Sequence, residues 1–568
     1  MIQKNDEYVI KITDLGMDGE GIGKICLDSE NSEGDNSGYT VFVKDALIGD
    51  IARIKIIKAK KSFGYGRLME ILEPSPYRVT PKCPVARACG GCQIMHLSYE
   101  QQLRFKENKV KNLLERIGKL RDYEMLPIIG MKEPYYYRNK AQFPVGKNKE
   151  GKIVIGFYAG RTHSIIDTEH CYIQHPLNEK LVHIVKQWME KYKIEPYEEE
   201  TQKGLIRHIL TRVGKRTGQV MVCLVINGTK LPYSDALISE LCAVEGMTSI
   251  SININRENTN VILGNEVRAL WGLPYITDYI GDICYQISPL SFYQVNPEQT
   301  QVLYRKALEF ANLKEGETVW DLYCGIGTIS LFLAQKAARV YGVEIVPQAI
   351  EDAKKNAALN HMDNVEFFVG KAEEVLPREY EKNHIYADVI VVDPPRKGCD
   401  ASLLDCMVKM APKRIVYVSC DPATLARDLR VLGEKGYEVV KVQGVDMFPG
   451  TVHVETVVLL SHKKADSYIH VDVEFGEGEG KIPLDNIAKR AAVYKPKERV
   501  TYKMIKEYIE EKYGFKVHTA YIAEVKRELG LPMYEASNAV EELKQPRKHP
   551  TAEKVETIKD ALRYFGVI

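Results

Sequence analysis

A thiol and a carboxylate stand late in the sequence at positions where each could do chemistry. Cys420 ends a predicted strand over residues 415–420, and Asp421 begins the helix that follows it. A thiol beside the amino end of a helix is favoured as thiolate, the form that attacks carbon. Glu455, on the last predicted strand of the same region, could act beside it as a general base. A lone cysteine at a strand end is more often inert, but this pair predicts covalent catalysis.

A glycine loop lies about a hundred residues earlier, in the segment Asp-Leu-Tyr-Cys-Gly-Ile-Gly-Thr that begins at Asp321. Gly325 and Gly327 allow a ligand to approach the backbone at the start of a helix. Ser330 stands where the third glycine of a dinucleotide fingerprint would be, which disfavours a pyrophosphate. Asp321 and Glu344, an acid at the end of the next strand, suit the sulfonium and the ribose diol of S-adenosylmethionine. The pattern therefore favours a methyl-donor site over a nicotinamide site.

Asp393 and Arg396 follow another predicted strand, over residues 389–392, in the sequence Asp-Pro-Pro-Arg. In a doubly wound sheet, ligands bind outside the carboxyl ends of the strands. We therefore expect both side chains to lie over the same site. The alternative interpretation is a proline turn that carries a surface ion pair.

Together these groups predict one reaction, the methylation of carbon 5 of a pyrimidine. That carbon is too weak a nucleophile to attack a sulfonium methyl group unaided. A thiolate added to carbon 6 by Cys420 would activate it, and Glu455 would then remove the proton of carbon 5. The target nucleotide must be flipped out of its stack for this attack.

A second cysteine group is predicted to bind a metal. Its members are Cys83, Cys89, Cys92 and the more distant Cys171. Four thiolates suit either zinc or an iron–sulfur cluster. Paired C-x2-C knuckles would favour zinc, whereas the spacing here is C-x5-C-G-G-C. From the residues alone, both metals stay open.

The elements that must position these residues fall into four predicted segments. Residues 1–73 read as short strands with glycine turns, which predicts a small β-barrel, and residues 74–290 mix strands and helices as an α+β region. Residues 291–462 alternate strand and helix, which predicts a Rossmann-like, mostly parallel sheet of seven strands. Residues 437–461 should add an antiparallel strand at the edge of that sheet. Residues 463–568 are predicted to form a small, mainly helical module.

Composition limits the class of protein. The chain has 568 residues, 45% of them hydrophobic, and a formal net charge of +1. This excludes a largely disordered or collagen-like chain, and no apolar run is long enough for a membrane helix. The first residues lack the apolar core of a secretory signal, so we expect a cytoplasmic protein with reduced thiols. Basic residues in the predicted barrel suit either nucleic acid or a solvated edge strand.

Taken together, the motifs resemble those of the RNA (uracil-5-)-methyltransferases of the RumA/RlmD/RlmCD type, over roughly residues 1–462. The resemblance implies that residues 1–73 form a TRAM domain, an OB-like barrel that binds RNA. It implies that the helix over residues 98–118 packs on the catalytic domain. It further implies a central [4Fe–4S] cluster, whose ligands would be Cys83, Cys89, Cys92 and Cys171.

The same resemblance assigns roles at the catalytic site. It implies Cys420 as the nucleophile and Glu455 as the proton acceptor, with Arg396 in the arginine position after the Asp-Pro-Pro turn. The contacts that it implies for S-adenosylmethionine are Gln294, Tyr323, Glu344 and Asp393.

Two departures from the family pattern bear on function. Gly450 stands where many relatives have histidine, which could alter a local RNA contact, and residues 463–568 have no counterpart. Bacterial tRNA-specific relatives generally lack both the TRAM domain and the cluster, so having both implies 23S rRNA as substrate, with tRNA as the alternative. A non-catalytic RNA-binding or ribosome-assembly factor is the third interpretation. We expect a monomer that binds RNA and no membrane.

Overall fold

The structure is a computed structural model that describes residues 2–26, 38–160, 162–168, 170–463, 502–529 and 549–565. The chain divides into two compact units, Met1–Asp466 and Ser467–Ile568. In the described part of the chain, no helix combines the length and apolar character needed to cross a bilayer. Of the helical module expected over residues 463–568, residues 464–501, 530–548 and 566–568 lie outside the described residues.

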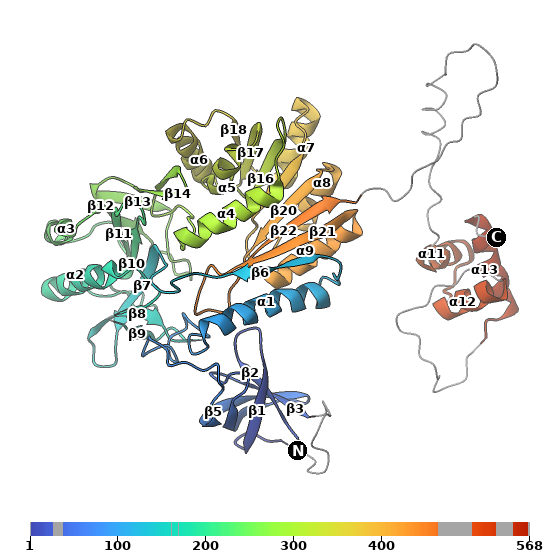
Figure 1. Ribbon diagram of the computed structural model, residues 1–568, viewed down its shortest axis with the longest axis horizontal. Coiled ribbons are helices and arrows are strands. Elements are labelled where there is room, and N and C mark those ends of the chain that lie inside the picture. Colours follow the sequence, from blue (N-terminus) through green and yellow to red (C-terminus); the bar gives the residue numbers. More distant parts are fainter. Residues whose placement is uncertain are drawn as a thin grey trace. The chain divides into compact units, whose positions relative to one another are not determined.

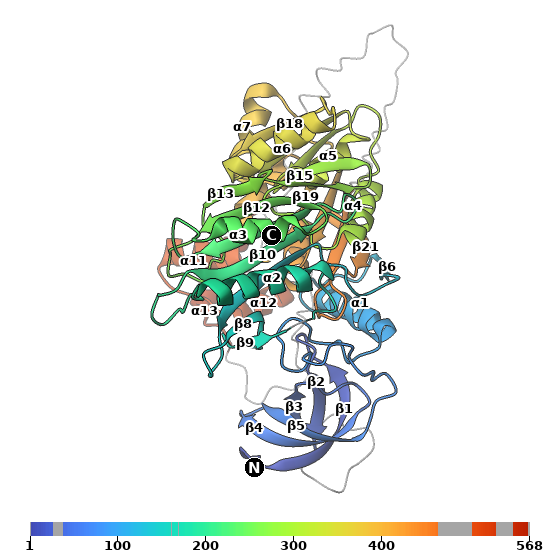
Figure 2. The ribbon, with the colours of Figure 1, turned by 90° about the vertical axis from the view of Figure 1, so that its left-hand side faces the viewer.

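The first unit begins with a closed five-stranded barrel (Figures 1 and 2). Its strands are β1 (Glu7–Leu15), β2 (Gly21–Ile25), β3 (Tyr39–Val43), β4 (Ile51–Ala59) and β5 (Phe63–Glu73), in the order β1-β2-β3-β5-β4. Alternate residues point inward, so Ala52, Ile54 and Ile56 of β4 are buried while Arg53 and Lys55 are not. The predicted barrel is confirmed.

A seven-stranded sheet, central in the sequence of the unit, has the order β13-β12-β11-β10-β7-β8-β9. Its strands are β7 (Lys140–Lys147), β8 (Ile153–Tyr158), β9 (Ile165–Asp167), β10 (Ile206–Val213), β11 (Val220–Ile226), β12 (Met247–Ile254) and β13 (Glu266–Gly272). Helices α2 (Leu177–Tyr192) and α3 (Ser234–Cys242) bury Leu181, Val185, Trp188 and Leu237 in one core with it. A separate hairpin consists of β14 (Ile276–Ile280) and β15 (Ile283–Ile287).

An eight-stranded sheet carries the predicted catalytic residues, in the order β18-β17-β16-β19-β20-β22-β21-β6. Its strands are β6 (Glu124–Ile129), β16 (Thr318–Leu322), β17 (Arg339–Glu344), β18 (Val365–Val369), β19 (Val389–Val392), β20 (Arg414–Ser419), β21 (Tyr437–Val445) and β22 (Glu455–His462). β22 runs antiparallel to both of its neighbours, and the remaining pairings are parallel.

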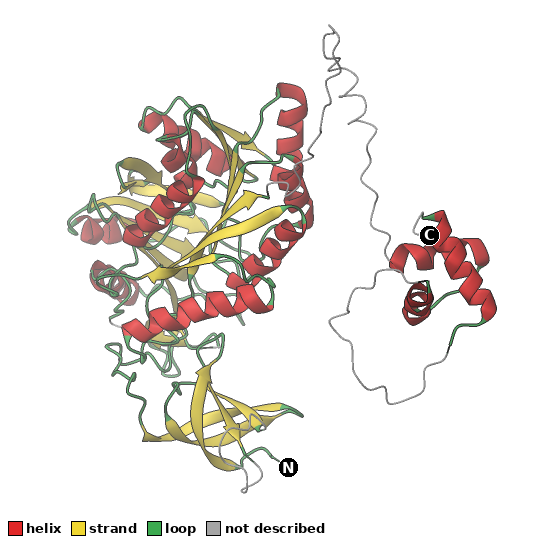
Figure 3. Ribbon diagram, turned by 45° about the vertical axis from the view of Figure 1, so that its right-hand side comes forward, coloured by secondary structure: helices red, strands yellow, loops and turns green. Residues whose placement is uncertain are grey.

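Helices cover both faces of this sheet, which gives three layers (Figure 3). On one face lie α4 (Pro297–Ala311), α5 (Thr328–Ala334) and α6 (Pro347–Leu359). On the other face lie α1 (Tyr99–Arg116), α7 (Ala372–Asn383), α8 (Ala401–Lys409) and α9 (Pro422–Glu434). Val110 and Leu114 of α1 belong to the same buried cluster as Leu425 of α9, so α1 packs on the catalytic layer.

Two expectations about this sheet are wrong. The sheet has eight strands and not seven, because β6 comes from the segment before the central sheet and pairs with β21 (Figure 1). The antiparallel strand β22 lies between β20 and β21 and not at the edge. Sequence periodicity predicts a strand but not its neighbours, which long-range pairing decides.

The second unit contains three described helices, α11 (Tyr502–Tyr513), α12 (Thr519–Glu528) and α13 (Ala552–Tyr564). Their apolar faces meet in one small core that includes Ile505, Ile509, Ile522, Val525 and Leu562. The amphipathic spacing of these residues accounts for the three helices.

Candidate active site

A cavity of about 1140 Å³ lies where β16, β17, β19 and β20 end. This is the crevice that a doubly wound sheet forms at the carboxyl ends of its strands. Its lining includes the side chains predicted to be catalytic, which are Asp393, Arg396, Cys420 and Glu455.

Cys420 and Glu455 come together because their strands are neighbours. β20 and β22 pair with Ser419 opposite Thr456, so Cys420 follows one member of that pair and Glu455 precedes the other. Glu455 is 3% exposed, whereas the Cys420 thiol is partly open to the cavity. The structure therefore places the expected nucleophile and the expected base next to each other, on the same face of the sheet.

The Cys420 thiol is not held as a thiolate by helix α9, contrary to expectation. The first free amides of α9 are taken by Asp421, whose carboxylate accepts hydrogen bonds from the N–H groups of Ala423 at 2.9 Å and Thr424 at 3.1 Å. Burial, followed by the charges of Glu455 and Asp393, raises the pKa of Cys420 to about 11. The thiol is therefore protonated at neutral pH, and its attack on carbon needs a group that takes its proton.

Two carboxyl groups of the cavity are suited to handle protons. Burial raises the pKa of Asp393, which follows β19, and that of Glu455, and the charge of Asp393 raises the pKa of Glu455 further. Arg396 acts in the opposite direction on Glu455 and on the thiol. A carboxylate with a raised pKa is a stronger base than an ordinary one.

The glycine loop after β16 forms another part of the cavity wall. Tyr323 and Gly325 have φ angles of +67° and +55°, so the backbone turns through the left-handed region. The N–H of Gly325 donates to Glu344 at 3.2 Å, and the N–H of Val346 donates to the other oxygen of that carboxylate at 3.0 Å. Tyr323, Gly325 and Glu344 all line the cavity and together offer a surface for a nucleoside.

Asp321 and Gly327 are not among the described residues that line this cavity. The Asp321 carboxylate is fully buried and accepts a hydrogen bond from the Ser330 hydroxyl at 2.5 Å, and burial raises the pKa of Asp321 to about 7. At Gly327, where φ is +81°, a Cβ atom would lie 3.1 Å from Phe367. Both residues therefore shape the loop from behind its ligand-facing surface.

Gln294 lies in the wall contributed by the segment before α4. The side chain of Asn139 donates to the carbonyl of Gln294 at 3.0 Å, and the backbone N–H of Asn139 donates to that of Val295 at 2.8 Å. Phe292 lines the same wall with 71% of its surface exposed. No motif in the sequence singles out Phe292, although its place as an aromatic residue two positions before Gln294 is a signal for it.

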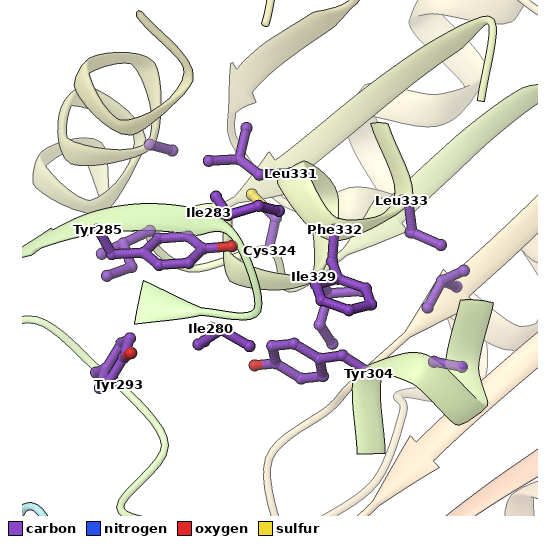
Figure 4. Close-up of a cluster of buried hydrophobic side chains, with 14 of the residues drawn as sticks. Ile280, Ile283, Tyr285, Tyr293, Tyr304, Cys324, Ile329, Leu331, Phe332 and Leu333 are labelled. Carbon is purple, nitrogen blue, oxygen red and sulfur yellow. The ribbon is translucent and has the colours of Figure 1, made fainter. Parts of the chain in front are cut away.

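An apolar cluster supports the glycine loop and includes Tyr304, a second cavity residue that no sequence motif indicates. Figure 4 shows Tyr304 of α4 beside Ile329 and Phe332 of α5, and the two aromatic rings lie 5.9 Å apart. Tyr304 also lines the cavity, and its hydroxyl lies 2.9 Å from that of Thr328. A tyrosine on the apolar face of an amphipathic helix is predicted to be a core residue, so the sequence does not indicate that Tyr304 lines the cavity.

The four thiols of the second cysteine group line the same cavity. They are Cys83, Cys89, Cys92 and Cys171. Burial, followed by the charges of the other three thiols, raises the pKa of Cys92 to about 12. Within the described ranges, no three or more His, Cys, Asp or Glu side chains form a group that could hold a metal ion.

Two family descriptions match this chain. Residues 3–69 match the TRAM domain, and residues 276–463 match the tRNA (Uracil-5-)-methyltransferase family. The prediction of a TRAM domain and a methyltransferase domain is thereby confirmed.

Relatives match almost over their full lengths. An uncharacterized RNA methyltransferase of Clostridium tetani is 52% identical over 81% of this chain and 97% of its own. One of Bacillus cereus is 53% identical over 81% and 97%. Among solved structures, the Pyrococcus abyssi tRNA (uracil-54, C5)-methyltransferase in complex with S-adenosyl-L-homocysteine is 28% identical. It matches with a TM-score of 0.64 over 80% of this chain and 100% of that one. This chain therefore belongs to the RNA (uracil-5-)-methyltransferase family and is an S-adenosylmethionine-dependent RNA methyltransferase with an amino-terminal TRAM domain.

Proposed function

We propose that this enzyme methylates carbon 5 of a uridine in 23S rRNA through a covalent adduct between Cys420 and carbon 6. The observation that carries the proposal is the register of β20 and β22, which puts Cys420 and Glu455 side by side in the cavity. A nucleophile and a base on adjacent paired strands can serve the same pyrimidine ring.

The first step forms the bond between sulfur and carbon 6. The thiol proton of Cys420 passes to the Asp393 carboxylate, and the sulfur attacks carbon 6 of the flipped uridine. The electrons of the carbon 5–carbon 6 double bond then move to the carbonyl oxygen at carbon 4, which gives an enolate. Arg396, whose charge lowers the pKa of Cys420, favours the sulfur anion during this step.

The second half of the reaction transfers the methyl group and restores the ring. Bound S-adenosylmethionine supplies an electrophilic methyl group, to which carbon 5 forms its new bond while the carbon–sulfonium bond breaks. Glu455 then takes the proton of carbon 5, the double bond forms again, and the bond to the Cys420 sulfur breaks. The sulfur regains its proton from Asp393, and Glu455 releases one proton to solvent. Burial, which raises the pKa of Glu455, makes it a base strong enough for this step.

The methyl donor is expected along the glycine loop. Tyr323, Gly325 and Glu344 present the loop surface, and Gln294 and Asp393 belong to the same lining. Asp393 lies beside the loop, because its backbone N–H donates to the carbonyl of Leu322 at 3.4 Å. Glu344 keeps a carboxylate near the position where a ribose diol needs an acceptor.

The second cysteine group is proposed to hold a [4Fe–4S] cluster. All four side chains supply thiolates of the type that iron–sulfur clusters use. Zinc, which accepts four thiolates as well, is the alternative occupant. Bound thiolates would also lose the mutual repulsion that raises the pKa of Cys92. The proposed role is structural, since methyl transfer to an enolate needs no electrons.

The substrate assignment rests on the domain combination, and tRNA is the second candidate. The TRAM domain together with a four-cysteine group favours 23S rRNA. The similarity to a Pyrococcus abyssi tRNA methyltransferase over 80% of this chain favours tRNA. Transcripts of 23S rRNA and of tRNA, incubated with the enzyme and labelled S-adenosylmethionine, separate the two. Label as 5-methyluridine in rRNA alone supports the proposal, and label in tRNA alone replaces its substrate. No 5-methyluridine in either transcript contradicts it.

A further inference from the structure

The loop that precedes Glu455 is held by one polar stripe on helix α1. The stripe consists of Tyr99, Gln102, Lys106 and Lys109, which are spaced three, four and three residues apart and therefore share one helix face. The loop spans residues 446–454 between β21 and β22, where Val445 pairs with Glu455. Any group that fixes this loop therefore also fixes the position of Glu455, the first residue of β22.

Lys106 makes the central contacts of this stripe. Its ammonium donates to Asp446 at 2.5 Å and to the carbonyl of Phe448 at 3.0 Å, and the side chains of Lys106 and Asp446 are both fully buried. Tyr99 donates to the other oxygen of Asp446 at 2.9 Å. A buried ammonium is costly unless it is paired and hydrogen-bonded, so this lysine has a specific reason to stand on the inner face of α1.

The two flanking side chains of the stripe hold the rest of the loop. The side-chain oxygen of Gln102 accepts from the N–H of Gly450 at 2.8 Å. Lys109 donates to the carbonyl of Val452 at 3.0 Å and to that of Met17, in the barrel, at 3.0 Å. The contacts therefore run along the loop from Asp446 to three residues before Glu455.

These contacts are better suited to fixing the position of the loop than to raising the stability of the fold. A buried ion pair is a weak source of stability, because desolvation offsets the attraction between the charges. The pair at Lys106 instead places a rigid bridge between the end of β21 and the carbonyl of Phe448. A misplacement of about 1 Å at a catalytic group is sufficient to cost about a hundredfold in rate.

We propose that Lys106, with Gln102 beside it, is a positioning residue that sets the reach of Glu455 toward carbon 5 of the target uridine. This inference rests on the proposed covalent mechanism. It assigns the stripe to one step, which is removal of the carbon 5 proton. Attack by Cys420, methyl transfer and binding of the methyl donor do not depend on it.

The test follows the labelled covalent adduct. The variant Lys106→Met/Asp446→Asn removes both buried charges together, and Gln102→Met removes one loop contact without touching a charge. The matched control is Glu317→Gln/Arg414→Met, which removes another shielded ion pair at the opposite end of β16 and β20. Each protein is mixed once with [methyl-³H]S-adenosylmethionine and the 23S rRNA or tRNA transcript that the wild type methylates. Denaturing gels then separate labelled protein–RNA adduct from labelled free RNA.

The positioning role predicts a specific pattern. Breakdown of the methylated adduct should slow by about ten- to a hundredfold in the Lys106/Asp446 variant and less in Gln102→Met, with wild-type breakdown in the control. Affinity for S-adenosylmethionine, from calorimetry, should not change. Adduct breakdown at the wild-type rate in both loop variants, or equal slowing in the control, would overturn the proposal. Glu455→Gln should retain the adduct; if it forms none, the covalent mechanism fails and the positioning role with it.

Discussion

Asp393 and Glu455 line the same cavity, and the charge of Asp393 helps burial to raise the pKa of Glu455. The two residues belong to different strands of the sheet: Asp393 directly follows β19, and Glu455 is the first residue of β22. Because a general base accepts a proton only when it is deprotonated, this relationship sets the pH range in which Glu455 can act.

The first prediction concerns that pH range. The raised pKa of Glu455 means that its active, deprotonated form increases as pH rises through a range above the ordinary glutamate value of 4.5. Asp393→Asn removes the neighbouring charge, so the pKa of Glu455 should fall and the acid limb of adduct breakdown should move to lower pH. Adduct formation should slow in the same variant, because Asp393 is the proposed acceptor of the Cys420 proton, so the profile is taken from breakdown of the adduct that forms. Single-turnover pH profiles at saturating S-adenosylmethionine measure this. Asp400→Asn, which removes an exposed carboxylate of the same cavity, is the control, and an acid limb equal in both variants contradicts the prediction.

The second prediction concerns Arg396. Its charge lowers the pKa of Cys420, so Arg396→Gln should raise that pKa and reduce the thiolate fraction. Formation of the adduct should slow by about tenfold, the effect of one pKa unit, and recover in part as pH rises. Lys397→Gln is the control, because Lys397 is an exposed neighbour that pairs with Asp400 at 3.3 Å. Rapid-quench experiments measure the rate of adduct formation in both variants. Equal rates in the two variants would refute the role of Arg396.

The third prediction concerns Phe292. A phenylalanine that lines a cavity with 71% of its surface exposed is suited to stack on a nucleotide base. Phe292→Ala should weaken RNA binding by about 1–3 kcal/mol, whereas Phe292→Tyr keeps the stacking surface. Tyr233→Ala removes another exposed aromatic ring, 59% exposed, that is not part of the described cavity lining. Filter binding with the transcript that the enzyme methylates measures the RNA affinities. An equal loss of affinity in Phe292→Ala and Tyr233→Ala counts against stacking.

The fourth prediction concerns the second cysteine group. Anaerobically purified protein should contain about four irons per chain and absorb as a brown iron–sulfur protein. Cys92→Ser should lose most of the iron, because it removes one of the four proposed thiolate ligands. Cys242→Ser, at a cysteine outside the group, should keep it. Metal analysis that finds zinc and no iron in the wild-type protein would contradict the proposed cluster and replace it with a zinc site.

The sequence predicts that Cys420 and Glu455 lie over the same crevice, but it does not predict the order of their strands or the protonation state of the thiol. Strand ends gather at one edge of a parallel sheet, so both residues could be expected over one crevice. Their direct juxtaposition depends on the insertion of β22 between β20 and β21, which no periodicity reveals. The expectation of a thiolate is not met, because burial and then the charges of Glu455 and Asp393 raise the pKa of Cys420. The amides at the start of α9 donate to Asp421 and not to the thiol.

The positioning stripe on α1 could not be read from the sequence. Lys106 lies among many charged residues, and an isolated helix gives no reason to place one lysine inward. Its partner, Asp446, lies 340 residues further along the chain. Asp321 shows the reverse case, since its motif suggests a ligand contact while its carboxylate is occupied by Ser330 behind the loop.

The covalent adduct itself is the most direct test of the mechanism. RNA transcribed with 5-fluorouridine has no proton at carbon 5 for Glu455 to remove, so the methylated adduct cannot break down. After protease and nuclease digestion, mass spectrometry should find the peptide containing Cys420 linked to a methylated fluorouridine, and Cys420→Ala should give none. Capture of the nucleotide on another cysteine, or methylation of ordinary RNA by Cys420→Ala, would contradict this account.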